Sequence, residues 1–214
     1  NVNSSYADQS ANSRVAMSKS QIRRPCCLHP LLLPDSSISS SRRPVCASCL
    51  RPTSACICSA VRTVRSPVEV LILMHPDEVG HAKNTGQLLH LCLPNSRVLV
   101  GTQFDDDTLH EALFDAWDGG IRPQHSLLLY PGSDSPELPP SPLQSSTRLV
   151  LIDSTWRKSR QMVAAHPLLQ NLPRLSLQDP PASRYAIRKA HEPHQLSTLE
   201  AAQLALQTLV PHND

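Results

Sequence analysis

Short continuous aliphatic runs constrain the fold of this chain more than any other feature. Residues 68–74, 97–100, 126–130 and 148–152 are dominated by Val, Leu and Ile, and residues 174–177 form a weaker fifth run. A strand that is covered on both faces has this composition, because polar alternation requires a face in contact with water. The runs therefore predict the buried strands of a single sheet.

Stretches with helix signals lie between and after these runs. They are residues 84–93, 105–117, 156–165 and 197–210. The last stretch begins Ser197-Thr198-Leu199-Glu200, which has the spacing of a capping box. Alternation of strands and helices predicts an α/β domain with a mostly parallel sheet and helices on both faces. Ligands bind at the carboxyl ends of the strands in such sheets, so we expect the site in the loops after Met74, Tyr130 and Ile152.

Length and composition limit the remaining possibilities. With 214 residues, 40% of them hydrophobic, the chain suits one α/β domain plus a small appendage. No run approaches the roughly 18 to 20 apolar residues of a membrane span. Because seven cysteines occur without a secretory signal, we expect reduced thiols or metal ligands and a cytoplasmic location.

The N-terminal part of the chain is strongly basic. Between Arg14 and Arg65 there are nine basic residues and one acidic residue, Asp35, a pattern typical of a segment that follows phosphates. Residues 1–41 are rich in Ser, Pro and Arg and show no sustained period, so we expect them to be largely disordered. For residues before Arg42, a soluble tail without a ligand is the alternative.

A cysteine cluster follows this basic segment. Cys46, Cys49, Cys56 and Cys58 have the spacing Cys-x2-Cys-x6-Cys-x-Cys, and four thiolates can close a tetrahedral zinc site. Such a site is structural, because a four-cysteine shell leaves no open coordination position. Two disulfides are the alternative, although a Cys-x-Cys bridge is strained. We predict a zinc module over residues 42–60, followed by the main domain over residues 61–214.

Two polar motifs stand at predicted strand ends. The first is His75-Pro76-Asp77-Glu78, followed by Lys83-Asn84-Thr85-Gly86; an ordinary capped loop is its alternative interpretation. The second, Asp153-Ser154-Thr155-Trp156, places a carboxylate at a strand tip and a tryptophan in a polar turn, where it could stack on a base. Its alternative is a capped helix with a solvated basic face.

A third polar stretch precedes the last predicted helix. It runs from Ser183-Arg184-Tyr185 through Arg188 to Ser197-Thr198-Leu199-Glu200-Ala201. Such a basic connection could close over an anionic ligand. A surface loop followed by a packing helix is the alternative.

In this order, the motifs resemble those of the DTW-domain family, over roughly residues 43–207. The family's Asp-x-Thr-Trp motif is matched by Asp153, Thr155 and Trp156, and the other motifs above, with Tyr130-Pro131-Gly132, complete the set. Gln87 departs from it, since a basic residue is more often expected after Asn-Thr-Gly.

The resemblance implies a SPOUT-like fold with a C-terminal knot. It also implies a tRNA-uridine aminocarboxypropyltransferase, which transfers the 3-amino-3-carboxypropyl group of S-adenosylmethionine to N3 of a uridine. This uridine is in the variable loop for bacterial members and in the D-loop for eukaryotic relatives. The partners would be tRNA and S-adenosylmethionine, with structural zinc. A SPOUT-type RNA methyltransferase and a non-catalytic zinc RNA-binding module are the alternative functions.

Site residues follow from the resemblance and from the motifs together. The predicted catalytic residues are Asp153, Thr155 and Trp156. The predicted cofactor-binding residues are Tyr130, Pro131, Gly132, Asp153, Ser197 and Thr198. The predicted RNA-binding residues are Arg42, Arg43, Arg51, His75, Arg157, Lys158, Arg160 and Arg188. An aspartate of ordinary acidity is a poor base for a weakly acidic imide, so we favour Asp153 as a residue that orients the uridine.

Overall fold

The computed structural model describes residues 44–132, 146–185 and 196–210. All of them belong to one compact unit, Ile38–Asp214. The predicted disordered segment, residues 1–41, lies outside the described residues. None of the described helices combines the length and the apolar character needed to cross a membrane.

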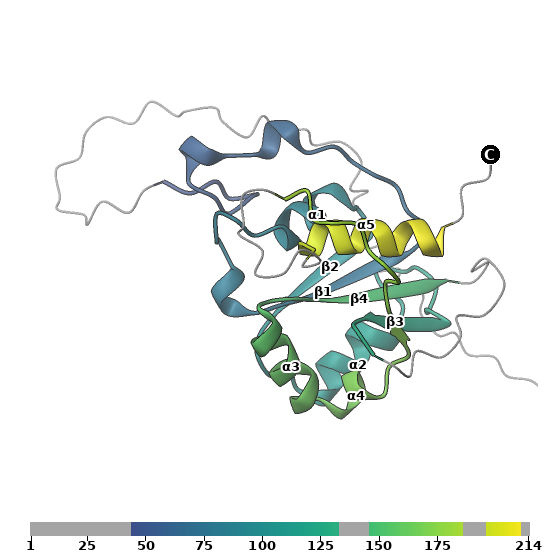
Figure 1. The fold of residues 1–214 in the computed structure, drawn as a ribbon. Coiled ribbons are helices and arrows are strands. Elements are labelled where there is room, and N and C mark those ends of the chain that lie inside the picture. The colour runs from purple at the N-terminus through teal and green to yellow at the C-terminus, as the bar shows by residue number, and fades with distance from the viewer. Residues whose placement is uncertain (1–43, 133–145, 186–195, 211–214) are drawn as a thin grey trace, which may run out of the picture. The chain divides into compact units, whose positions relative to one another are not determined.

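A five-stranded parallel sheet forms the centre of the domain, as predicted (Figure 1). Its strand order is β2-β1-β4-β3-β5. The strands are β1 (Glu69–Met74), β2 (Ser96–Val100), β3 (His125–Leu129), β4 (Thr147–Asp153) and β5 (Arg174–Leu175). The weak fifth run is thus a strand, but only its first two residues pair with β3. β4 is central and ends at Asp153, which lies beside Met74 of β1.

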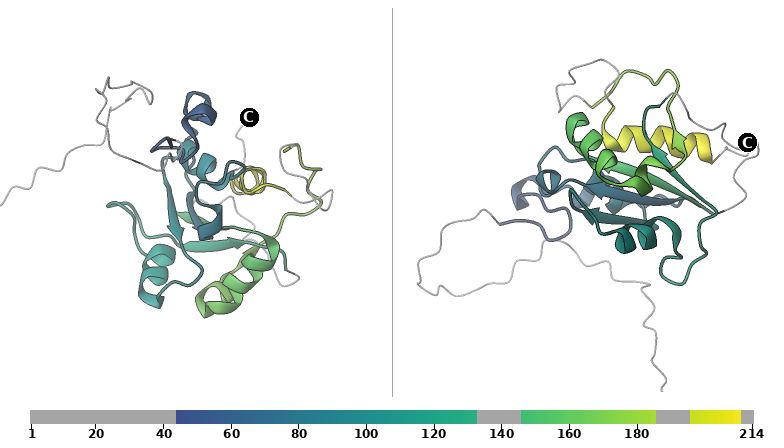
Figure 2. Two further views of the ribbon diagram at one scale, coloured as in Figure 1. Left: turned by 90° about the vertical axis from the view of Figure 1, so that its left-hand side faces the viewer. Right: turned by 90° about the horizontal axis from the view of Figure 1, so that it is seen from below.

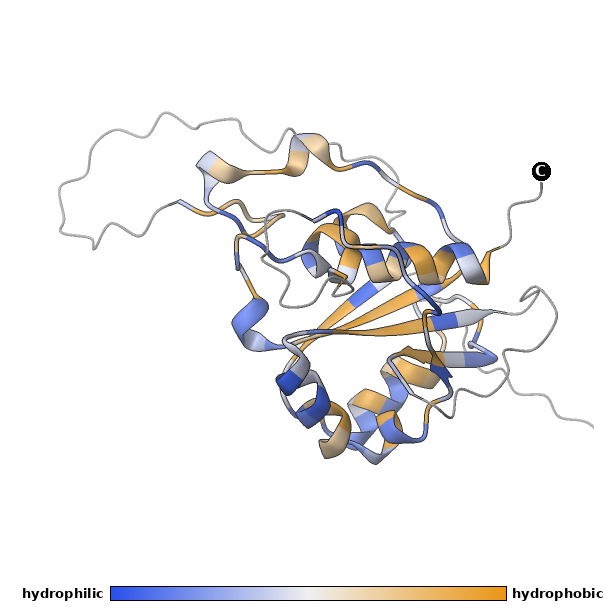
Figure 3. Ribbon diagram, viewed as in Figure 1, coloured by the Kyte–Doolittle hydropathy of each residue, from blue (hydrophilic) through white to orange (hydrophobic). Residues whose placement is uncertain are grey.

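Helices cover both faces of the sheet (Figures 1 and 2). Helices α1 (Gly86–Cys92) and α5 (Thr198–Leu209) pack on one face; α2 (Asp106–Phe114), α3 (Trp156–Ala165) and α4 (Pro167–Gln170) pack on the other. Three 3-10 helices, η1 (Thr53–Ala55), η2 (Cys58–Ala60) and η3 (Pro76–Glu78), lie in the connections. Figure 3 shows that the middle of the sheet is apolar and that hydrophilic residues lie at strand ends, as expected for a sheet covered on both faces.

Local capping explains where the predicted helices begin and end. The α5 capping box is present, with Ser197 at the cap and Glu200 three residues later. The predicted helix over residues 84–93 begins later, at Gly86, because the Asn84 side chain accepts a hydrogen bond from the backbone N–H of Gln87. The prediction over residues 105–117 extended too far, since α2 ends at Phe114. The short helix α4, which begins at Pro167, was not predicted.

A buried arginine lies at the amino-terminal end of the central strand, opposite the end that carries the pocket. The Arg148 side chain is fully buried at the start of β4 and pairs with Glu69 at 2.5 Å. It also donates to the carbonyl oxygens of Ala112 and Asp115, at the end of α2, and stacks 3.8 Å from the centre of the Trp117 ring. Arg148 therefore neutralises the carbonyl end of α2 and anchors this helix to the sheet.

The predicted parallel α/β architecture is confirmed by this sheet. The connection from β5 to α5 includes residues 186–195, which lie outside the described residues. The SPOUT-like knot therefore stays a prediction.

Candidate functional site

A pocket of about 530 Å³ lies at the carboxyl ends of β3, β4 and β5. Six residues that were predicted to be catalytic or cofactor-binding line it: Tyr130, Pro131, Thr155, Trp156, Ser197 and Thr198. They come from the loop after β3, the turn from β4 into α3, and the start of α5. The pocket's volume is in the range of sites that enclose a drug-sized molecule.

Two aromatic side chains form one wall of this pocket. The rings of Tyr130 and Trp156 meet edge to face, with centroids 6.0 Å apart. The Arg174 guanidinium lies 5.2 Å from the Tyr130 ring centre and donates to the Pro131 carbonyl at 3.1 Å. Arg174 also packs closely over Gly132, where a Cβ atom would lie 3.1 Å from its Cδ. Trp156 is still 47% exposed, so its ring is available to a ligand.

The start of α3 borders the same pocket. Thr155 is its N-cap residue, but no hydrogen bond from the helix start reaches its side chain. The exposed Arg157 side chain also lines the pocket. A helix N-terminus and a guanidinium thus present positive charge at this wall.

Asp153 is buried directly behind the pocket. One carboxylate oxygen accepts from the Asn84 side-chain amide, and the other accepts from the Thr198 hydroxyl at 2.6 Å. Ile152 and Ser154 on either side line the pocket, whereas the Asp153 carboxylate is directed between the starts of α1 and α5. Asp153 therefore joins three elements at the carboxyl end of β4.

Gly86 lets α1 approach this carboxylate. A Cβ atom at position 86 would lie 2.5 Å from an Asp153 oxygen, a distance that side chains do not tolerate. The backbone of α1 and the carboxylate are consequently packed in direct contact. This close approach requires a glycine.

Residues 183–185 close the pocket next to α5. The Glu200 carboxylate accepts from the Ser183 hydroxyl at 2.9 Å and from the Arg184 backbone N–H at 2.7 Å, in addition to the backbone N–H and hydroxyl of Ser197. Burial acts to raise the pKa of Glu200, but these hydrogen bonds outweigh it and hold the pKa below its usual value. Tyr185 donates to the Lys83 carbonyl at 3.2 Å. This segment thus connects α5 to the loop before α1.

The His75-Pro76-Asp77-Glu78 motif has mainly local partners. His75 caps η3 by accepting from the Asp77 backbone N–H at 3.1 Å. Asp77 pairs with Lys158 of α3, and this lysine lowers the pKa of the exposed Asp77 carboxyl. Lys158 therefore already has a protein partner, and the motif ties the loop after β1 to α3.

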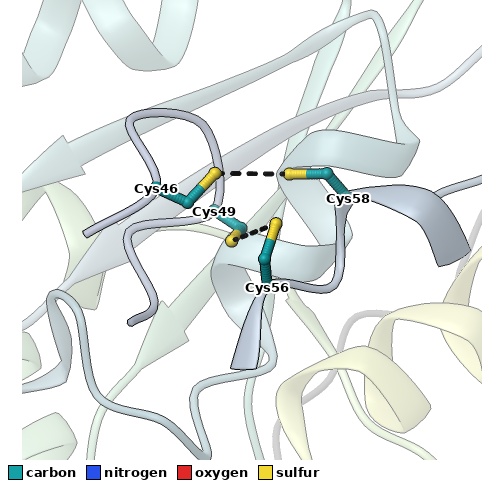
Figure 4. A group of neighbouring side chains, drawn as sticks. All are labelled: Cys46, Cys49, Cys56 and Cys58. Atoms are coloured by element: carbon teal, nitrogen blue, oxygen red, sulfur yellow. Dashed lines mark hydrogen bonds between the residues drawn. The ribbon is translucent and has the colours of Figure 1, made fainter. Parts of the chain in front are cut away.

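The four cysteines predicted to bind metal lie together (Figure 4). All four sulfur atoms are within 4.8 Å of one another, and the Cys46–Cys58 and Cys49–Cys56 pairs are 3.7 and 3.8 Å apart. Sulfur ligands at about 2.3 Å from zinc in a tetrahedron are ~3.8 Å apart. The arrangement fits a tetrahedral metal site, and neither pair is joined by a disulfide bond in this structure.

The cysteine cluster contacts the loop before α1. Arg51 donates to the Asn84 carbonyl at 3.0 Å, and the Gln87 side chain donates to the Ser48 carbonyl at 3.1 Å. Gln87, where a basic residue was expected, thus bonds to the backbone of the cluster.

The predicted RNA-binding residues are distributed unevenly. Arg157 and Arg160 are exposed on α3, whereas Arg51, His75 and Lys158 are partly buried and bonded to other residues. Arg42, Arg43 and Arg188 lie outside the described residues.

Several site residues were absent from the sequence-based assignment. They are Asn84, Gly86, Arg174, Ser183, Tyr185 and Glu200. The Asn-Thr-Gly sequence marked a helix start, but nothing in it specified the contact of Asn84 and Gly86 with Asp153. Arg174 carried no signal, because its contact with Tyr130 depends on the pairing of β5 with β3.

A family model described as "DTW domain" matches residues 43–214. The chain is 32% identical to tRNA-uridine aminocarboxypropyltransferase 2 of Mus musculus over 182 residues, which are 81% of this chain and 59% of the mouse protein. It is 34% identical to the protein of the same name from Drosophila melanogaster over 176 residues, covering 79% of this chain and 68% of the fly protein. No solved structure gives a significant match.

The chain spans somewhat more than half the length of its mammalian relatives, since the macaque protein is also covered over 59%, at 30% identity. The match to the family model includes the cysteine cluster, every strand and the pocket. On this evidence the chain belongs to the DTW-domain family.

Proposed function

We propose that this protein is a tRNA-uridine aminocarboxypropyltransferase. It would transfer the 3-amino-3-carboxypropyl group of S-adenosylmethionine to N3 of a tRNA uridine, in the variable loop. The names of its relatives support the transfer of this group to tRNA uridine. The pocket that brings together the motifs after β3, after β4 and at the start of α5 is the observation that carries the proposal.

The reaction makes one carbon–nitrogen bond and breaks one carbon–sulfur bond. Uridine N3 attacks the γ-methylene of S-adenosylmethionine, the electron pair of the carbon–sulfur bond stays on sulfur, and methylthioadenosine leaves. The N3 proton is released to solvent or to a base. The protein must therefore hold the methylene, and not the methyl group, in line with N3.

In this proposal Asp153 is a positioning residue. Its two carboxylate oxygens accept from Asn84 and Thr198, so they are already occupied by donors in the absence of substrate. Sulfonium charge is lost as the new bond forms, so a carboxylate against sulfur would stabilise the ground state more than the transition state. Asp153 acts instead by fixing the Thr198 hydroxyl at the pocket wall.

The aromatic wall would hold the bases. A uridine must leave the tRNA fold to expose N3, and stacking on an aromatic ring compensates for the lost contacts. Trp156 has the exposure that such stacking requires, and Tyr130 is held beside it by Arg174. We assign Trp156 to the uridine and the Tyr130-Pro131 segment, with Ser197 and Thr198, to S-adenosylmethionine.

Arg157 is the best-placed group for the carboxylate of the transferred chain. It lines the pocket beside the N-terminus of α3, where negative charge is favoured. Arg160, one turn further along α3 and exposed, would contact tRNA phosphates outside the pocket.

We assign zinc to the cysteine cluster, in a structural role. Thiolates in a tetrahedral arrangement favour this metal, and all four positions of the shell would be filled by protein. The relatives are named for modification of tRNA, which supports a cytoplasmic location for the enzyme.

The test is incubation of the protein with S-adenosylmethionine and unmodified tRNA transcript, followed by mass spectrometry of nucleosides and cofactor products. Aminocarboxypropyl-uridine together with methylthioadenosine is the expected result. A methylated nucleoside with S-adenosylhomocysteine would contradict the proposed chemistry and indicate a methyltransferase. Binding of tRNA without either product would indicate a non-catalytic RNA-binding protein.

A further inference from the structure

Arg51 connects the cysteine cluster to the core of the domain. Its carbonyl oxygen accepts from the Cys46 backbone N–H at 2.8 Å, so its backbone is part of the loop that holds the first cysteine pair. Its guanidinium donates to the Asn84 carbonyl at 3.0 Å. One residue thus contacts both the metal-binding loop and the segment before α1.

Asn84 connects Arg51 to Asp153. It is 5% exposed, and its side chain has two partners: the amide donates to Asp153, and the oxygen accepts from the Gln87 backbone N–H at 2.7 Å. Because its carbonyl is held by Arg51, the backbone and the side chain of Asn84 are fixed together. A shift of Arg51 would therefore act on both the cap of α1 and the Asp153 carboxylate.

The pathway ends at the pocket. Asp153 accepts from Thr198 at 2.6 Å, and the neighbouring Leu199 backbone N–H is directed at Oγ1 of Thr85 at 3.4 Å. Thr198 lines the pocket, whereas Asn84 and Thr85 are both buried. A continuous series of hydrogen bonds thus runs from the cysteine loop to the pocket wall.

We propose that Arg51 is a positioning residue that couples the cysteine cluster to Asp153 through Asn84, so that metal binding to the cluster orders the Thr198 end of the pocket. The coupling itself is independent of the proposed function. Its importance for the transfer reaction rests on the proposed function. The coupling replaces the sequence-based assignment of Arg51 to RNA. A phosphate contact would alter the affinity for tRNA and its salt dependence, and would leave amides around Asn84 unchanged in the free protein.

The two roles are separated by hydrogen exchange in the free, metal-loaded protein. The informative amides are those of Gln87, bonded to the Asn84 side chain, and of Leu199, directed at Thr85. The Leu109 amide of α2, on the other face of the sheet, is the internal reference. Arg51→Met keeps most of the side-chain volume and removes the donor. Arg62→Met is the matched control, because within the described part of the chain Arg62 donates to the nearby carbonyls of Ser59 and Val61 and to no other residue.

In Arg51→Met we expect exchange at Gln87 to be roughly tenfold faster, the factor expected for one lost charge-assisted hydrogen bond. Leu199 should change in the same direction, and Leu109 and the Arg62→Met protein should be unchanged. Removal of metal from the wild-type protein with a chelator should reproduce the change at Gln87. If the chelator also accelerates hydrogen exchange at the Leu109 amide, removal of metal has unfolded the chain. The exchange rates of the Arg51→Met protein then decide whether Arg51 couples the cluster to Asn84.

Unchanged exchange at Gln87 in Arg51→Met would overturn the coupling through Arg51. Lower tRNA affinity with a smaller salt slope, in the absence of any exchange effect, would restore the phosphate role. None of these measurements uses the transfer reaction. A protein that lacks the proposed activity but shows the exchange pattern would therefore refute the function and leave the coupling in place.

Discussion

A methyl group on Gly86 would put its carbon 2.5 Å from an Asp153 carboxylate oxygen and 2.7 Å from the carboxylate carbon. The Asp153 side chain at the end of β4 thus packs directly against the backbone of the first turn of α1. Substitutions at these two positions should consequently affect each other.

Gly86→Ala should lower the free energy of unfolding. Alanine is normally favoured over glycine in a helix by about 1 kcal/mol, so an observed loss of stability would isolate the contact with Asp153. Urea denaturation measures the change. In a double-mutant cycle, Asp153→Ala should relieve the cost of Gly86→Ala, because the clashing carboxylate is gone. Additive effects would show that the two residues do not interact as described.

Asp153→Asn should reduce the proposed transfer reaction by roughly 100-fold, the loss expected when a reacting group is displaced by about 1 Å. An asparagine cannot accept from both Asn84 and Thr198, so one of these donors loses its partner. Steady-state kinetics measure the effect on kcat. Thr198→Val should lower kcat in the same way, and the double variant should be no worse than Asp153→Asn alone. Full turnover by Asp153→Asn would refute the positioning role.

Glu200→Gln should destabilise the protein by about 1 kcal/mol at pH 7, because the capping box and the bonds to Ser183 and Arg184 are weakened. The hydrogen bonds hold the folded-state pKa of Glu200 below its ordinary value of 4.5. The stabilisation by the carboxylate is therefore complete above that value and is lost as the pH falls through the folded-state pKa. The difference in unfolding free energy between wild type and variant should shrink between pH 7 and pH 3. A difference that is constant over this range would mean that the carboxylate charge contributes nothing.

Trp156→Ala should raise KM for tRNA by about tenfold or more, since stacking of a base on an aromatic ring contributes roughly 1–3 kcal/mol. Trp156→Phe should retain most of the affinity. The side chain is 47% exposed, so the melting temperature should change little in either variant. An unchanged KM in Trp156→Ala would show that the Trp156 ring does not stack on the uridine.

Cys49→Ser should reduce the zinc content below one equivalent and destabilise the protein, because Cys49 is almost fully buried at 2% exposure and supplies one of the four sulfur ligands. Native mass spectrometry measures the metal stoichiometry. Cys92→Ser is the control: Cys92 is a free cysteine of α1 outside the cluster, and its loss should leave the zinc content unchanged. A wild-type protein that purifies without zinc and does not bind added zinc would contradict the assignment of zinc to the cysteine cluster.

The sequence predicted the layers of this domain well, for a physical reason. Strands buried on both faces must be aliphatic, and their runs identify them without reference to their neighbours. The start of α5 was equally accessible, because Ser197 and Glu200 satisfy each other within four residues. Structural features that depend on neighbouring residues alone could thus be predicted from the sequence.

Contacts between distant segments could not be read in the same way. Asn84 stood in a polar motif with an ordinary capped loop as its alternative interpretation, and neither interpretation predicted that it meets Asp153 across 69 positions of sequence. Lys158 was assigned to phosphate because its charge was visible, and its partner Asp77, 81 positions away, was not. The order β2-β1-β4-β3-β5 determines these meetings, and the pattern of residues does not specify this order.

The late position of α5 in the chain has a consequence for synthesis. Until residues 198–209 leave the ribosome, the face of the sheet that carries Val70, Ile72 and Leu149 is covered by α1 and lacks α5. The pocket also lacks Ser197 and Thr198 until then. A nascent chain that has completed every strand would still expose an aliphatic surface to chaperones and would be unable to form the whole pocket, so this part of the molecule matures only after translation of its last helix.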